Sequence, residues 1–240
     1  MKKAAPSAAT SADSDRNALT AEWLAGLFWS PLAIETVRSL RTGPDAAFLD
    51  ALAFQPECKV GAKRMRAVLQ AGSDPAEVAR QLAAEFSLLF DGVGGPKTAW
   101  LYESAYLGSP GRLFQTPTGD MERLLLLADV SVVCGANEPA DHLSIELALL
   151  ARMMRQGASF RRQSALLDLH LMTFIPLFAA RCFEAGRTGF YAAAADLMIG
   201  FLQARREALD DRSDPSNLPI GKRGFDIALI ADRNLGEAPL

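Results

Sequence analysis

Apolar residues recur at helical spacing along most of this chain, and this periodicity constrains the fold more than any other feature. One helix is expected to begin at Asp74-Pro75-Ala76-Glu77, because a capping aspartate, a first-turn proline and a third-position glutamate favour a helix start. Apolar residues then follow on one face until Asp91-Gly92 ends the pattern: Val78, Leu82, Phe86, Leu89 and Phe90. The short alternating run Val130-Ser131-Val132-Val133 continues a helical pattern. We therefore predict an all-α chain.

The same spacing predicts four further long helices: Met121 to Val133, Pro139 to Arg155, Gln163 to Phe183, and Phe190 to Leu209. Gln163 to Phe183 is apolar on nearly all sides, so we expect it at the centre of the fold, kinked at Pro176. Ser30-Pro31 is also typical of a helix start, with a cap followed by a first-turn proline.

The two ends of the chain lack this periodicity. Met1-Lys2-Lys3 imitates the start of an export signal, but no apolar region follows it before residue 18. Beyond Asp210 the pattern is lost again, and only Phe225 to Ile230 could dock back onto the body. We predict a disordered tail over residues 1–18, one helical bundle of about nine to eleven helices over residues 19–210, and an extended tail over residues 211–240.

Composition narrows the class of protein. The 240 residues are 50% hydrophobic and 22% charged, as in globular proteins, and the net charge of −3 with no long basic run argues against a nucleic-acid partner. Three widely separated cysteines, Cys58, Cys134 and Cys182, are typical of a reducing compartment. The most apolar stretch, Leu171 to Ala180, is too short to cross a bilayer. We expect a soluble cytoplasmic protein without a membrane segment.

The segment Glu138-Pro139-Ala140-Asp141-His142 places acids and a titratable ring at the start of an apolar helix. With Pro139 at the first helical position, Asp141 would be third, where its carboxylate can accept free backbone N–H groups. Alternatively, Asp141 faces outward and pairs with an incoming guanidinium. The sequence leaves both roles open.

His142 is followed one turn later by Glu146, and a pair at this spacing could raise the histidine pKa or fix its tautomer. A satisfied, partly buried imidazole is the structural alternative. No metal site is predicted, because the chain has two histidines and no H-E-x-x-H pattern. The glycines at Gly92 to Gly95 lack the spacing of a phosphate-binding loop and favour a helix stop.

Three aromatic residues, Trp100, Tyr102 and Tyr106, lie within seven positions of one another and are interrupted by Glu103 and Ser104. Glycine-rich breaks flank this cluster on both sides, so we expect it on a short helical or irregular piece between two loops. Such rings belong either to the core or to a peptide-binding surface, where tyrosine and tryptophan combine apolar area with a polar group.

Together the two segments resemble the TorD/DmsD/NarJ family of redox-enzyme maturation chaperones. The family's E-P-x-D-H segment corresponds to residues 138–142, and its Y-x-S-x-Y stretch to residues 102–106. The resemblance implies a TorD-like helical fold and a non-catalytic cytoplasmic chaperone with no cofactor of its own. Its expected partners are the apo-form catalytic subunit of a molybdenum-containing oxidoreductase and the twin-arginine leader of that subunit.

The resemblance also implies a peptide-binding site. Acids at Glu103, Glu138 and Asp141 would meet the leader's two arginines, while neighbouring rings and the Leu143 side of the helix would cover its apolar stretch. The full set expected at this site is Trp100, Tyr102, Glu103, Ser104, Tyr106, Glu138, Pro139, Asp141, His142, Leu143 and Glu146. Such a site requires an acidic, ring-lined hollow that is open to solvent.

Two other functions remain open at this point. One is a helical scaffold subunit that stays permanently with its partner. The other is a nucleotide-dependent hydrolase that uses His142 with Asp141 or Glu146 as acid–base groups, although no nucleophile can be named. The chain is expected to be a monomer or a dimer formed by exchange of a segment.

Overall fold

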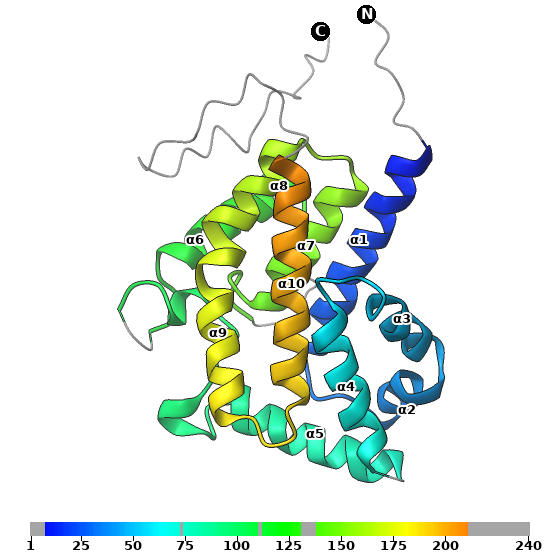
Figure 1. Ribbon diagram of the computed structural model, residues 1–240. Coiled ribbons are helices and arrows are strands. Elements are labelled where there is room, and N and C mark those ends of the chain that lie inside the picture. Colours follow the sequence, from blue (N-terminus) through cyan, green and yellow to red (C-terminus); the bar gives the residue numbers. More distant parts are fainter. Residues whose placement is uncertain (1–7, 73, 110–111, 131–137, 211–240) are drawn as a thin grey trace, which may run out of the picture.

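The computed structural model describes residues 8–72, 74–109, 112–130 and 138–210. Within these residues there are ten α-helices, three short helical turns and one isolated β-bridge, so the predicted all-α class is confirmed (Figure 1). The α-helices are α1 (Ala8–Leu27), α2 (Ile34–Thr42), α3 (Pro44–Leu52), α4 (Lys59–Ala71), α5 (Pro75–Phe90), α6 (Thr116–Leu127), α7 (Leu143–Arg155), α8 (Phe160–Leu166), α9 (Met172–Ala185) and α10 (Phe190–Asp210). The turns are the 3-10 turns η1 (Gly95–Lys97) and η2 (Glu103–Ala105) and the π-helical turn η3 (Leu167–Leu171).

The long helix α10 runs through the middle of the view in Figure 1, with α9 on one side and α4 on the other. Helix α1 packs along α7, and α5 crosses the lower end of the bundle. Helices α2 and α3 form a pair at the right-hand edge, against α4. This arrangement places the N-terminal end of α7 close to the segment that carries η2.

Aromatic side chains from four parts of the chain meet in the core. Phe28 follows α1, Phe86 and Phe90 lie on α5, Phe178 on α9 and Tyr191 on α10. Ring centroids are 5.4 Å apart for Phe28 and Phe178, and 5.2 Å apart for Phe90 and Tyr191, both edge to face. Such pairs stabilise the fold beyond the area that they bury, so this cluster holds the bundle together.

Helices α4 and α10 approach so closely that glycine is required at two contacts. A Cβ added at Gly61 of α4 would lie 2.6 Å from the carbonyl oxygen of Ala193. One added at Gly200 of α10 would lie 2.0 Å from the carbonyl oxygen of Glu57. Both contacting atoms are backbone oxygens, which cannot rotate away as a side chain could. Any larger residue at either glycine must therefore push the two backbones apart.

Several predicted helix boundaries are confirmed. Asp74 caps α5 by accepting a hydrogen bond from the Ala76 N–H at 2.9 Å, and the helix ends before Asp91. Gly92, with φ of +79°, then adopts the left-handed conformation that stops a helix. Helix α10 covers the range predicted from residues 190 to 209 with one residue more.

Other predicted boundaries are wrong. The helix expected at Ser30-Pro31 begins only at Ile34, and no side chain caps it. Helix α6 begins at Thr116 rather than at residue 121, and Asp129, with φ of +51°, ends the helical path. Residues 131–133, expected in that helix, lie outside the described residues, as do Cys134 and the possible docking segment 225–230.

The expected disordered tail over residues 1–18 is wrong for residues 8–18. Helix α1 begins at Ala8, and the Ser14 hydroxyl donates to the carbonyl oxygen of Met154 at 3.0 Å. Ala18 is fully buried. An alanine-rich segment has high helix propensity, and contact with α7 supplies the packing that such a helix needs. Residues 1–7 and 211–240 lie outside the described part.

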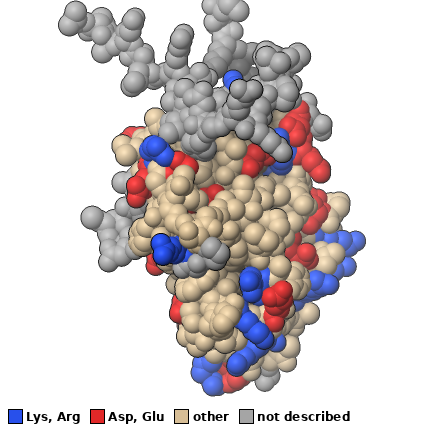
Figure 2. All heavy atoms as spheres, turned by 90° about the vertical axis from the view of Figure 1, so that its left-hand side faces the viewer, with Lys and Arg blue, Asp and Glu red and all other residues tan. Residues whose placement is uncertain are grey.

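Helix α9 is not the fully enclosed central helix that its sequence predicted. Leu177 and Phe183 are about half exposed, although Phe174 and Phe178 are fully buried. The run Phe160–Ala185 is long and apolar enough to span a membrane by composition alone, but half of its most apolar window is buried inside this bundle. On the left-hand face of Figure 1, where α9 lies, the middle of the surface is largely uncharged, with lysines and arginines gathered toward its lower end (Figure 2).

Candidate functional site

The two segments singled out in the sequence lie against each other. Tyr102 and His142 form an antiparallel β-bridge. The Glu103 N–H donates to the carbonyl oxygen of Asp141 at 3.1 Å, and the Leu143 N–H donates to the carbonyl oxygen of Leu101 at 2.7 Å. Because these backbone groups pair across the two segments, residues 139–142 are not helical, and the prediction that the helix begins at Pro139 is wrong.

Asp141 is fully buried and its carboxylate is satisfied from two sides. One oxygen accepts from the Ser104 N–H at 2.8 Å, and the other accepts from the Thr118 hydroxyl, also at 2.8 Å. Asp141 therefore ties η2 to the start of α6. It is neither the third residue of a helix nor an outward-facing partner for a cation, so both roles weighed from the sequence are corrected.

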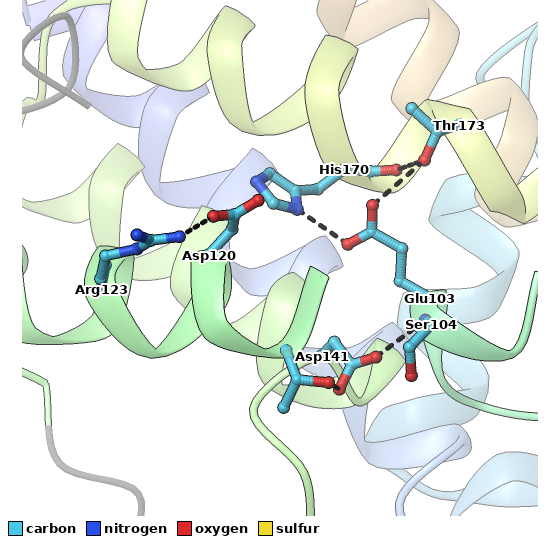
Figure 3. A network of polar contacts seen from close by, with 8 residues as sticks. Glu103, Ser104, Asp120, Arg123, Asp141, His170 and Thr173 are labelled. Carbon is cyan, nitrogen blue, oxygen red and sulfur yellow. Dashed lines mark hydrogen bonds and ion pairs between the residues drawn. The ribbon is translucent and has the colours of Figure 1, made fainter. Parts of the chain in front are cut away.

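Glu103 is sealed in the same region. Its exposed fraction is 1%, one carboxylate oxygen lies 2.8 Å from Nδ1 of His170, and the Thr173 hydroxyl donates to the other at 3.4 Å. Figure 3 shows the Glu103 and His170 side chains pointing toward each other, with Asp141 and Ser104 close below. The network joins η2, η3, α6 and the segment before α7 inside the bundle.

Glu146 completes this group from the first turn of α7. It is fully buried, and burial, followed by the nearby negative charges of Glu103 and Asp141, raises its pKa well above the usual value. Burial and these neighbours therefore favour the neutral form of the Glu146 carboxyl over its charged form. Among the described residues, Glu103, Glu146 and His170 have potential metal-ligand atoms within 4.8 Å of one another. All three side chains are buried.

His142 caps helix α7. Its Nδ1 accepts a hydrogen bond from the Ser144 N–H at 3.1 Å, which places its ring proton on Nε2. Burial lowers the pKa of His142 to about 4, although the negative charges of Glu138 and Asp141 oppose this shift. The expectation that Glu146 raises the histidine pKa or fixes its tautomer is wrong, because Ser144 makes the contact.

The half-exposed rim of this site is aromatic. The ring of His142 lies between those of Trp29 and Tyr102, at centroid distances of 5.4 and 5.3 Å. The Tyr102 hydroxyl donates to exposed Glu138 at 2.7 Å. Trp100 is half-buried beside Gly92, where an added Cβ would lie 3.2 Å from the indole ring.

The open acidic hollow expected from the sequence is therefore closed. Of its three acids only Glu138 reaches the surface, while Glu103 and Asp141 are sealed inside. The expected site residues that are buried are Glu103, Ser104, Pro139, Asp141, His142, Leu143 and Glu146. Tyr106 is half-buried against Phe174, with ring centroids 5.7 Å apart. Trp100, Tyr102 and Glu138 remain available to a partner.

Beside this rim, an apolar groove of about 620 Å³ opens between α1 and α7. Trp29 stands at the end near His142, and Arg152 and Arg155 stand at the other end. Its apolar lining consists mainly of Ala25, Leu125, Ile145, Ala148 and Leu149. No sequence pattern indicated this groove, because its two walls are more than a hundred residues apart in the chain.

The buried histidine does not have the geometry of a hydrolase. Its Nδ1 is occupied by a backbone N–H, and both oxygens of Asp141 are used within the fold. A general acid or base has to reach the proton that it transfers. The arrangement gives no support to the acid–base pair considered from the sequence.

Comparison with known proteins shows the family of this chain. The family model described as nitrate reductase delta subunit matches residues 52–180, more than half of the chain and including both paired segments. The chain belongs to the nitrate reductase delta subunit family. In this chain the two matched segments are joined by backbone hydrogen bonds, so they contribute to the fold as well as to the surface.

Relatives named chaperone protein TorD extend the match over most of the chain. The protein from Vibrio cholerae serotype O1 (strain M66-2) is 30% identical over 199 residues, covering 79% of this chain and 90% of the relative. Those from Photobacterium profundum and Aliivibrio fischeri are 29% and 30% identical, each covering 75% of this chain and 88% of the relative. The resemblance to the TorD/DmsD/NarJ family is thereby confirmed.

Proposed function

We propose that this chain is a non-catalytic cytoplasmic chaperone for the maturation of a molybdenum-containing oxidoreductase. Membership of the nitrate reductase delta subunit family, together with its similarity to TorD chaperones over most of its length, is the observation that carries the proposal. The chaperone holds the apo-form catalytic subunit until its cofactor is inserted, and it recognises the twin-arginine leader of that subunit.

The leader arginines meet the exposed acids around Tyr102 rather than the sealed carboxylates. Glu138 is exposed and hydrogen-bonded to Tyr102, and the exposed Asp91 lies close enough to Tyr102 to contribute to its raised pKa, which burial chiefly causes. A carboxylate in this setting can pair with a guanidinium without the cost of burying the charge. Trp100 and Tyr102 supply adjoining aromatic surface.

The apolar part of the leader lies in the groove between α1 and α7. Trp29 links the two subsites, because its ring contacts that of His142, and the His142 ring also contacts that of Tyr102. An apolar groove with a polar rim at one end suits a peptide that has a charged start and an apolar continuation. Because the client has to be released, we expect an affinity that is roughly micromolar, or about 8 kcal/mol.

Co-purification of the untagged client with this chain separates the chaperone from a permanent scaffold. The tagged chain is expected to recover the apo-form precursor, and to lose it once the molybdenum cofactor has been inserted. Stable association with the mature, cofactor-loaded enzyme would instead establish a scaffold subunit. Turnover of GTP by the purified protein, with or without divalent cations, would contradict the non-catalytic assignment.

The surface subsite is tested by Glu138→Gln, with Glu184→Gln as a matched control on an exposed acid of α9. Loss of the rim charge is expected to weaken leader-peptide binding about tenfold, the scale of one charge-assisted contact, while the control leaves it unchanged. Equal affinities for both variants and the parent chain would remove Glu138 from the site.

A further inference from the structure

The chain carries a segment whose chemistry matches that of the leader described above. Lys222 and Arg223 are adjacent cations, and after one glycine they are followed by the apolar run Phe225 to Ile230, interrupted only by Asp226. We propose that residues 222–232 of this chain occupy the groove between α1 and α7 when no client is bound. This inference rests on the proposed function, since it assigns the same groove a second, internal ligand.

Charge complementarity supports one direction of binding. The exposed acid Glu138 lies near the Trp29 end of the groove, where Lys222 and Arg223 would sit. At the opposite end Arg155 is paired with Glu22, which also lines the groove, so Arg152 is the cation that suits the acid Asp232 after the apolar run. In this direction the basic start of the segment meets Glu138, its apolar middle meets the apolar lining, and Asp232 meets Arg152.

The lengths also agree. The groove follows α7 from its cap at residue 142 to residue 155, about 20 Å at the helical rise of 1.5 Å per residue. Residues 222–232 span about 15 Å as a helix and about 33 Å when extended, so an intermediate or partly helical form covers the groove. The segment has no glycine between residues 225 and 232 that would interrupt such a form.

The connection to the body is long enough. Helix α10 ends at Asp210, and its last turns share a cavity of about 430 Å³ with the end of α7 and the start of α1. Lys222 lies twelve positions after Asp210. A chain of this length can reach about 40 Å. This exceeds the length of α7, so Lys222 can reach the Trp29 end of the groove.

An internal ligand competes with the client for the groove. The apparent affinity for the client is reduced to the fraction of chains whose groove is empty. In the full chain, Arg223→Gln combined with Phe225→Ser removes one cation and one apolar anchor from the segment. The matched control, Arg212→Gln combined with Leu218→Ser, removes the same kinds of group outside it. We expect the first variant to bind a synthetic leader peptide at least about threefold more tightly than the parent chain, and the control to bind it equally.

Equal leader affinity in the parent chain and the Arg223→Gln, Phe225→Ser variant would overturn the inference while leaving the proposed function intact. Absence of leader binding in every chain would instead count against the proposed function. A second readout then decides the inference by itself: a photoreactive benzoylphenylalanine in place of Phe225 is expected to cross-link within one chain to α1 or α7. Cross-links elsewhere, or only between two copies of the chain, would overturn it.

Discussion

At the scale of single residues, the acids expected at the site divide into those buried in the fold and one that lies on the surface. Asp141 accepts two hydrogen bonds deep in the bundle, and burial raises the pKa of Glu146 beside Glu103. Glu138 alone of the acids expected at the site is exposed. Substitution of a sealed acid therefore tests stability, whereas substitution of Glu138 tests binding.

Asp141→Asn is expected to lower the free energy of unfolding by about 2–4 kcal/mol, because one of two buried donors loses its charged acceptor. Asp50→Asn is the matched control, since Asp50 is half-exposed and pairs only with Arg66. That control should stay within about 0.5 kcal/mol of the parent chain. Urea unfolding measures both, and similar small losses in the two variants would show that the Asp141 contacts contribute little.

His142 gives the stability a defined dependence on pH. Its pKa is about 4 in the fold and 6.5 for a free histidine, so between these values the unfolded chain binds more protons than the folded one. Stability from this residue is complete above pH 6.5 and is lost as the pH falls toward 4, a change of about 3 kcal/mol. His142→Asn keeps an acceptor for the Ser144 N–H but cannot titrate.

The unfolding free energy of the parent chain should therefore fall relative to that of the His142→Asn variant by about 3 kcal/mol between pH 7 and pH 4. Because both chains retain Glu146 and the other titrating groups, subtracting the two curves isolates the histidine. Parallel curves over this range would mean that His142 is not held neutral.

The sequence indicated which residues gather at the site but not how they are arranged. Its motifs placed Asp141, His142 and Tyr102 together, and they do lie together. The backbone pairing that excludes residues 139–142 from a helix depends on a loop about forty residues away, and no local pattern carries that information. Burial of the acids follows from the same pairing, so it was missed as well.

At the scale of helices, hydrophobic periodicity predicted the helices that have long apolar stripes. It was less informative for helix ends and for the N-terminal helix. Helix α5 was predicted from its cap to its glycine stop, since every signal is local. The early start of α6 at Thr116 and the helical form of residues 8–18 were missed, because neither has a long apolar stripe. Contact with α7 supports α1, and this contact is not visible in the sequence of α1 alone.

Two helical glycines are expected to respond in opposite ways to substitution by alanine, because Gly61 lies at the close contact of α4 and α10 and Gly119 faces open space. Gly61→Ala should destabilise the protein by about 1–3 kcal/mol, because the added methyl group meets the backbone of α10. Gly119→Ala in α6 is the matched control: no atom lies within 4 Å of the added Cβ, so helix propensity should stabilise the protein by up to about 1 kcal/mol. Thermal unfolding measures both; stabilisation by Gly61→Ala would contradict the packing described here.

At the scale of the whole molecule, a sealed polar network and an open apolar groove meet near His142. The network fixes the loop that carries Tyr102, and the groove continues from Trp29 along α1 and α7. The fold class and the family followed from the sequence. The groove did not, because helices far apart in the chain form it.

Recognition of a twin-arginine leader is the central claim, and calorimetry on the full chain tests it most directly. A synthetic leader peptide is expected to bind with a roughly micromolar Kd. The same peptide with both arginines replaced by glutamine should bind at least about tenfold more weakly, since it cannot pair with Glu138. No heat from the leader peptide, or equal binding of the two peptides, would contradict the claim.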